Sequence, residues 1–406
     1  MPLTPKHPLT SADITRRSAL TALVATGVAP ATTAIAAPLA PRMDAAAIRS
    51  PWLCNGVAVA PDGAVFLGLP RLAGHRDTPS LAKVGAEGMP EPFPGGAWNG
   101  WRQGGDGRNA FVMVNAVHVF DDGSLWVVDQ GAAAGQPMPG AAKLVRLDPV
   151  TGAVLATIRF DAGILPPGAA MNDLRLHGNV VFVTDSGLGG IIVHDLAAGR
   201  TLRRLSRHPL LRHTPGSVQK GYEGRVLADG AGRRPTVHSD MIELDADGAW
   251  LYWSTPTGPV RRIATELLLD ERLDDDALAR AIQTVATIPS IGGTAMDTQG
   301  NLYLSDAEAR RIAVLTPQGR ILTLAQDERL VSPDAIFIDG ARRLHVPAAQ
   351  LEDLAAHAGG TDKTRAPWQV LSCALPDTLD GVMLGDAVTG RPHRGLSPIG
   401  TSNRSQ

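Results

Sequence analysis

A short strand–turn–strand unit recurs six times along this chain of 406 residues. Each unit starts with a polar residue or a glycine, continues as a short apolar strand, and reaches a turn that is Asp-Gly in most copies. A second strand rich in β-branched and aromatic residues follows, which predicts a β-hairpin. The units begin at Asn55, Asn115, Asn172, Asp240, Gly292 and Asp334.

Several units are followed by another hairpin, in residues 143–152, 190–199 and 311–319. Four strands per unit predict an all-β fold, a six-bladed β-propeller over residues 50–376 with a short helical insertion and long loops over the channel. Periodicity alone also allows a β-solenoid, but the long irregular insertions favour the propeller. Residues 377–406 lack periodicity, and we expect them to form a loosely ordered tail.

The composition agrees with a turn-rich β protein, because glycine (44) and proline (31) are both frequent. The formal net charge of −2 gives no electrostatic case for nucleic acid or an acidic membrane surface. No stretch approaches the roughly 18 apolar residues of a membrane span. The motifs of nucleotide cofactor sites are missing from the sequence, and we expect a monomer that takes a small-molecule ligand.

The first 36 residues have the features of a twin-arginine signal peptide. Arg16 and Arg17 precede a mildly apolar run, and Ala34-Ile35-Ala36 supplies the small residues of a cleavage site. The alternative is a basic segment in front of a core helix. The signal-peptide interpretation predicts a mature protein that begins near residue 37 and works in the periplasm or outside the cell.

Polar residues at the start of the inner strands are the best candidates for a binding site. In a propeller the innermost strand of each blade follows the central channel, so its first residues lie at the channel mouth. Polar groups gathered there need water, a ligand or a metal to satisfy them. The alternative is that each one only turns the backbone before its strand. The expected ligand-binding residues of this set are Asn55, Asn115 and Asn172, with Asp173, Asp240 and Asp334 as acidic members.

Three further residues outside this set are candidates for function. His238 is a candidate acid or base because histidine titrates near neutrality, and its alternative role is a structural hydrogen bond. Trp98 and Trp101 are candidates for stacking on an aromatic or cationic ligand, and otherwise pack between blades. The insertion at residues 206–238 is expected to cover the channel as a lid.

The two cysteines of the chain stand at opposite ends of the expected propeller. Cys54 precedes the first blade, and Cys373 lies in a strand expected to finish the last one. Since a propeller brings its first and last blades together, the two are candidates for a disulfide in an exported protein. The alternative is two buried free thiols.

Several short motifs resemble the Yellow/major royal jelly protein family in its bacterial branch, over roughly residues 50–376. They include Trp98-Asn99-Gly100-Trp101, Asn172-Asp173 and His238-Ser239-Asp240. The resemblance implies an exported six-bladed propeller with a ligand-binding channel. Members of the family bind small biogenic amines, take part in dopachrome conversion, or act as storage proteins.

Related gluconolactonase-type propellers hold a divalent metal in the channel with Glu, Asn and Asp side chains. This chain has Asn55 where that pattern has Glu, and Gly292 where it has the Asp proposed as the base. The resemblance therefore leaves Asp173, Asp240 and Asp334 as ligands for a cation such as Ca²⁺, which prefers oxygen donors.

The sequence thus favours an exported protein that binds a small amine or a catechol-like molecule in its channel. The alternative is an enzyme that uses the same channel, either a metal-dependent lactone hydrolase or a dopachrome-type isomerase. Three carboxylates close together repel one another, so their pKa values are expected to rise unless a divalent cation or a cationic ligand offsets the charge.

The signal-peptide interpretation predicts that export depends on the arginine pair. Replacing Arg16 and Arg17 by lysine is expected to leave uncleaved precursor in the cytoplasm. Cell fractionation with an antibody against the mature chain measures this, and normal export of the double variant would refute the assignment.

Overall fold

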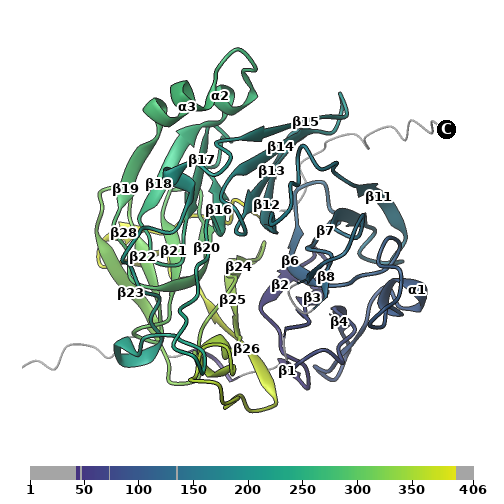
Figure 1. Cartoon of the computed structure of the whole chain (residues 1–406). Coiled ribbons are helices and arrows are strands. Elements are labelled where there is room, and N and C mark those ends of the chain that lie inside the picture. Colours follow the sequence, from purple (N-terminus) through teal and green to yellow (C-terminus); the bar gives the residue numbers. More distant parts are fainter. Residues whose placement is uncertain (1–42, 46–47, 73, 134–135, 390–406) are drawn as a thin grey trace, which may run out of the picture. The chain divides into compact units, whose positions relative to one another are not determined.

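A computed structural model describes residues 43–45, 48–72, 74–133 and 136–389 of the chain, which belong to one compact unit, Ala40–Gln406. It contains six four-stranded antiparallel sheets arranged as the blades of a ring (Figure 1). The predicted fold class, a six-bladed β-propeller, is confirmed. Arg16 and Arg17 lie outside the described residues.

The first three blades follow the chain from the inner strand outward. Blade one contains β2 (Gly56–Val59), β3 (Val65–Gly68), β4 (Leu81–Val84) and β5 (Pro90–Pro92). Blade two contains β6 (Val114–Val119), β7 (Leu125–Asp129), β10 (Lys143–Leu147) and β11 (Val154–Ile158). Blade three contains β12 (Met171–His177), β13 (Val180–Asp185), β14 (Ile191–Asp195) and β15 (Arg200–Arg204).

Blades four and five repeat this order. Blade four contains β16 (Met241–Leu244), β17 (Trp250–Ser254), β18 (Val260–Ala264) and β19 (Gln283–Ala286). Blade five contains β20 (Ile291–Met296), β21 (Leu302–Asp306), β22 (Arg311–Leu315) and β23 (Ile321–Gln326). The six inner strands begin at or within a few residues of the six starts predicted from the sequence.

Blade six closes the ring with strands from both ends of the propeller. It contains β24 (Phe337–Ile338), β25 (Arg343–Ala348), β26 (Trp368–Ala374) and, as its outer strand, β1 (Ile48–Ser50). β1 pairs antiparallel with β26, so that Ser50 lies opposite Trp368, and Figure 1 shows the purple β1 beside the yellow β26. The segment before blade one therefore completes the last sheet.

The shorter elements lie in the connections. They are α1 (Gly96–Asn99), α2 (Thr265–Leu269), α3 (Asp275–Ala281), the 3₁₀ turns Pro209–Leu211, Tyr222–Gly224 and Leu351–Asp353, and the pairs β8 (Ala132–Ala133) with β9 (Gln136–Pro137) and β27 (Thr378–Leu379) with β28 (Val382–Met383). α2 and α3 form the expected helical insertion, and Asp274 caps α3 by accepting a hydrogen bond from the Ala277 N–H. Among the described residues, no helix is both long and apolar enough to span a bilayer.

The hydrophobic core is divided among the gaps between neighbouring blades. Five clusters of buried apolar side chains together fill these gaps around the ring. A blade is therefore covered on both faces, which explains why a strand such as β7 is buried at every residue.

Residues 377–389, expected to belong to a loose tail, instead dock on blade five. Gly385 N–H donates to Asp297 Oδ2 at 2.9 Å, and Val388 N–H donates to the carbonyl of Met296 at 3.0 Å. Asp297 is fully buried, and its Oδ2 also accepts hydrogen bonds from Asn301 Nδ2 at 2.8 Å and from the Tyr303 hydroxyl at 3.1 Å. Sequence periodicity does not reveal a contact of this kind, and residues 390–406 lie outside the described part.

The expected disulfide is absent, because both cysteines are free and buried. Cys54 packs in the cluster that blade one shares with blades two and six, whereas Cys373 packs in the cluster between blades five and six. The first and last blades do meet, but the contact is the pairing of β1 with β26. The alternative of two buried thiols is the correct one.

We expect both thiols to be inert in the native protein. Burial, with the nearby Asp334 carboxylate, raises the pKa of Cys54 to about 12, and burial raises the pKa of Cys373 to about 11. Iodoacetamide without reductant should therefore label both cysteines in denaturant and neither in buffer, as measured by intact mass. Labelling in denaturant that requires prior reduction would contradict the structure.

Candidate ligand-binding channel

The polar residues predicted at the channel mouth do line one cavity, of about 280 Å³, at the centre of the ring. Figure 1 shows the inner strands β2, β6, β12, β16, β20 and β24 arranged around this centre. The lining includes all six polar residues singled out from the sequence: Asn55, Asn115, Asn172, Asp173, Asp240 and Asp334.

Irregular strand pairing turns several of these residues toward the cavity. The register shifts between Val114 and Ala116 in β6, between Met171 and Leu174 in β12, and between Ile291 and Thr294 in β20. A bulge leaves the extra residues unpaired and changes the direction of their side chains. The residues left out of the pairing all line the cavity: Asn115, Asn172, Asp173, Gly292 and Gly293.

The two bulge glycines of β20 explain why blade five offers no carboxylate. A Cβ on Gly292 would clash with the Pro333 carbonyl oxygen, and one on Gly293 would lie 2.6 Å from the Cα of Ala335. At these two glycines the backbones of blades five and six are in direct contact, and no side chain fits at either position. The departure from the lactonase pattern at Gly292 is therefore a packing requirement.

A buried arginine occupies the channel behind Asp173. The Arg175 guanidinium donates to Glu243 through Nε at 2.9 Å and through Nη2 at 2.6 Å, and to Asp173 Oδ2 through Nη1 at 2.9 Å. The other Asp173 oxygen lies 2.7 Å from His118 Nε2. Both oxygens of Asp173 are therefore already engaged by cationic or donor groups of the chain itself.

The residues predicted from the sequence do not include Arg175, His118 or Glu243. Each lies three residues after a polar start, in inner strands that are otherwise apolar: Val-His-Val, Leu-Arg-Leu and Ile-Glu-Leu. A charged or polar side chain inside such a strand is rarely buried without a partner. These three residues could have been predicted from this exception to the apolar pattern of the strands.

The pKa values of the three aspartates differ because only one has a cation beside it. Burial alone would raise the pKa of Asp173, but Arg175 and His118 outweigh it and hold that pKa below its usual range. Burial and the Asp173 charge raise the pKa of Asp240 to about 7. Burial, with Asp240 and Asp173 nearby, raises the pKa of Asp334 well above its usual range.

The polar atoms that remain at the cavity are mostly hydrogen-bond acceptors. Asn115 and Asn172 use their Nδ2 groups to donate to the Asn172 carbonyl and to Ser186 Oγ, both at 3.1 Å. Asn55 is nine-tenths buried, and its Oδ1 has no donor among the described residues. Within the same residues, the Asp240 carboxyl has no hydrogen bond or ion pair, and Asp334 has no ion pair.

Asp173, Asp240 and Asp334 do not form the three-carboxylate site expected for a divalent cation. Among the described residues, no group of three or more His, Cys, Asp and Glu side chains is arranged to hold a metal ion. Asp173 faces Arg175 and His118, and the fifth blade contributes glycines, which leaves Asp240 and Asp334 as the acidic side chains of the cavity without a cation from the described part of the chain.

Val237, rather than the predicted acid or base His238, lines the cavity. Nδ1 of the buried His238 accepts a hydrogen bond of 3.1 Å from the His213 N–H, and burial and Arg212 lower its pKa. Consecutive residues of an extended chain point in opposite directions, so Val237 points into the cavity and His238 points away from it. His238 therefore has the alternative role, a structural hydrogen bond.

Trp98 and Trp101 also lie away from the channel. The Trp98 ring packs on Phe111, with centroids 5.0 Å apart, in the core beside blade one. The buried Trp101 donates from Nε1 to the Gly105 carbonyl at 3.1 Å, and the Arg71 guanidinium lies over its ring. The expectation that they stack on a channel ligand is not supported by these positions.

Part of the insertion at residues 206–238 forms a wall of the cavity, as expected for a lid. Gln219, Pro235 and Val237 line it, together with Leu351 and His357 from the connection after β25. The buried Glu352 ties these two segments together, because its Oε2 accepts a hydrogen bond of 2.8 Å from the Tyr222 N–H.

Comparison with known proteins identifies the family. The sequence profile described as "Major royal jelly protein" matches residues 112–376. The chain belongs to the major royal jelly protein family. No curated protein matches the chain in sequence.

Solved structures of other propellers are similar to this chain at low sequence identity. A gluconolactonase from Xanthomonas campestris has 14% identity over 83% of this chain and 95% of its own, with a TM-score of 0.49. Regucalcin from Agrobacterium tumefaciens, a calcium-binding protein, has 14% identity over 86% and 98%, with a TM-score of 0.48. Virginiamycin B lyase from Staphylococcus aureus has 14% identity over 72% and 77%, with a TM-score of 0.42.

We expect Arg175 to be essential for stability of this royal jelly family propeller. Arg175→Met leaves two buried carboxylates without their cation, which should lower the free energy of unfolding by about 3–5 kcal/mol. Denaturant unfolding followed by circular dichroism measures the change. The exposed Arg320 is a matched control, and Arg320→Met should change stability by no more than about 0.5 kcal/mol. A loss below about 1 kcal/mol for Arg175→Met would contradict the network.

Proposed function

We propose that this protein binds a small protonated amine in its central cavity, with Asp240 and Asp334 as counter-ions. The observation that supports the proposal is that the cavity mouth has acceptors and carboxyls but no free cation among the described residues of the chain. Hydrogen-bond acceptors and two carboxyls without an ion pair face a cavity whose buried cation, Arg175, already belongs to Asp173 and Glu243.

An ammonium group supplies what the cavity lacks. It offers three donors and one positive charge, which suit the Asp240 and Asp334 carboxylates. A bound cation also favours the ionised forms of Asp240 and Asp334, whose pKa values are raised without it. Charge and hydrogen bonding therefore both favour the binding of an ammonium group.

The remaining walls suit the carbon body of a small amine. They are formed by Leu72, Met113, Met241, Ile291 and Leu351, with prolines beside them. A cavity of about 280 Å³ is at the small end of ligand sites in proteins. Family membership supports the proposal, since amine binding is one function that the resemblance implied.

Isomerisation of an oxidised catechol is the second candidate. It is favoured by Asp240, because a carboxyl with a pKa of about 7 suits proton transfer at neutral pH. Lactone hydrolysis has no comparable support, since the fifth blade lacks a base and the acidic residues do not fit a divalent cation. A dopachrome turnover assay with Asp240→Asn as control separates the isomerase from a binding protein.

We also propose that the protein acts outside the cytoplasm. This rests on Arg16, Arg17 and the Ala34-Ile35-Ala36 cleavage motif in the sequence. A small amine from outside the cell would then reach the cavity without crossing the cytoplasmic membrane.

Calorimetric titration with dopamine tests amine binding, with 4-ethylcatechol as the analogue that lacks the ammonium group. We expect dopamine to bind more tightly, and Asp240→Asn to weaken it by roughly tenfold or more, because one charge-assisted contact is lost. Affinity should rise with pH through about 7, since deprotonation of Asp240 creates the counter-ion.

The control for this titration is Asp121→Asn, which removes an exposed carboxylate on blade two and should leave dopamine affinity unchanged. Equal affinity for dopamine and 4-ethylcatechol would contradict the proposal. The same holds if wild type binds dopamine and Asp240→Asn binds it equally well.

A further inference from the structure

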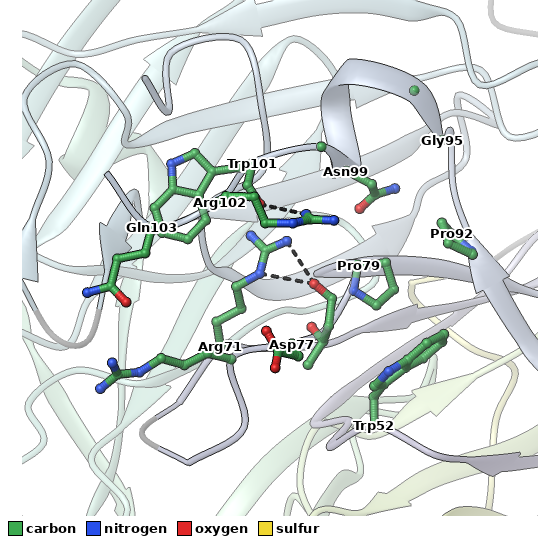
Figure 2. A pocket seen from close by; sticks show the side chains of 14 residues that line it. Trp52, Arg71, Asp77, Pro79, Pro92, Gly95, Asn99, Trp101, Arg102 and Gln103 are labelled. Carbon is green, nitrogen blue, oxygen red and sulfur yellow. Dashed lines mark hydrogen bonds between the residues drawn. The ribbon is translucent and has the colours of Figure 1, made fainter. Parts of the chain in front are cut away.

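A second and larger cavity, of about 630 Å³, lies beside blade one (Figure 2). Its walls are formed by Trp52 before the blade, by Arg71 and residues 76–79 between β3 and β4, by Pro92 at the end of β5, and by residues 95–96 and 99–103 after that strand. Trp101, Pro79 and Pro92 add apolar surface to that of Trp52. The volume is within the usual range for a small-molecule site.

The two cavities share one wall. Pro70 and Leu72 line the central cavity, whereas Arg71 between them lines the second one. The Arg71 guanidinium fixes this wall by donating to the carbonyls of Thr78, at 2.8 and 3.0 Å, and of Phe111 and Val112, at 2.6 and 2.9 Å. The second cavity is thus built by buried hydrogen bonds.

The second cavity has an excess of positive charge. Arg71 bonds only to carbonyl oxygens, so no carboxylate cancels its charge directly. Burial lowers its pKa to about 10, which still leaves it charged at neutral pH. Arg76 and Arg102, both exposed, have no ion pair among the described residues, and Asp77 is the one acidic residue in the lining.

One of the residues that line this cavity, Asn99, has a buried acceptor without a donor in the described part of the chain. Asn99 is nine-tenths buried at the end of α1, and its Nδ2 donates to the Phe93 carbonyl at 2.7 Å. Its Oδ1 then has no donor among the described residues, which is costly for a buried polar atom. In Figure 2 the Asn99 side chain points from α1 toward Pro79 across the cavity.

We propose that this second cavity binds a small aromatic carboxylate. The guanidinium groups of Arg76 and Arg102 pair with the carboxylate, and the tryptophan and proline side chains hold the flat ring. Asp77 disfavours a doubly charged anion such as a phosphate monoester, because it repels the second charge.

Indole-3-acetate has each of these features and is the probe, with the uncharged indole-3-acetamide as its matched analogue. Calorimetric titration of the full-length protein should show indole-3-acetate binding at least tenfold more tightly. The double variant Arg76→Gln/Arg102→Gln should lose roughly tenfold or more in affinity for indole-3-acetate. Arg320→Gln, an exposed arginine on blade five that lines neither cavity, should lose nothing.

The effect of Asp77→Asn on affinity tests whether the ligand is negatively charged. Removing this carboxylate should tighten indole-3-acetate binding severalfold, because it removes a repulsion. Weaker binding in Asp77→Asn would overturn the proposal, and so would equal affinity for the acid and the amide. Asp240→Asn should leave indole-3-acetate affinity unchanged, which separates this cavity from the central one. The exposed positions of Arg76 and Asp77 make loss of folding an inadequate explanation for either result.

Discussion

The ion pairs of Arg175 are the interaction on which the arrangement of the channel depends. Its guanidinium joins Asp173 of β12 to Glu243 of β16, and these carboxylates reach His118 of β6 and Thr294 of β20. Four of the six inner strands therefore meet at one buried cation. Because the charge of Arg175 is used there, the carboxyls at the cavity mouth are left without a cation from the chain.

The shape of the mouth follows from backbone irregularities rather than from the regular sheets. Bulges in β6, β12 and β20 direct polar side chains or bare backbone into the cavity. In blades two and three this gives asparagine amides and Asp173, whereas in blade five it gives two glycines. The result is a small cavity rich in acceptors, and its asymmetry arises because each blade contributes different chemistry at the same register.

The sequence was sufficient to predict the number of blades and the polar residues of the mouth, because each unit carries its own turn and its own polar start. The sequence was insufficient to predict contacts between segments that lie far apart along the chain. The three-residue strand Ile48–Ser50 gives no local sign that it closes blade six. The choice between Val237 and His238, and the pairing of Arg175 with Glu243, likewise depend on how separate blades meet.

The most direct test of the account is whether binding of an amine displaces a proton. Dopamine is titrated at pH 6.5 in buffers of different ionisation enthalpy, below the pKa of about 7 for Asp240. If the ammonium group takes the place of a proton on Asp240 or Asp334, a substantial fraction of a proton is released per dopamine bound. Binding with proton uptake, or with no exchange, would contradict the assignment of these carboxyls as the counter-ions.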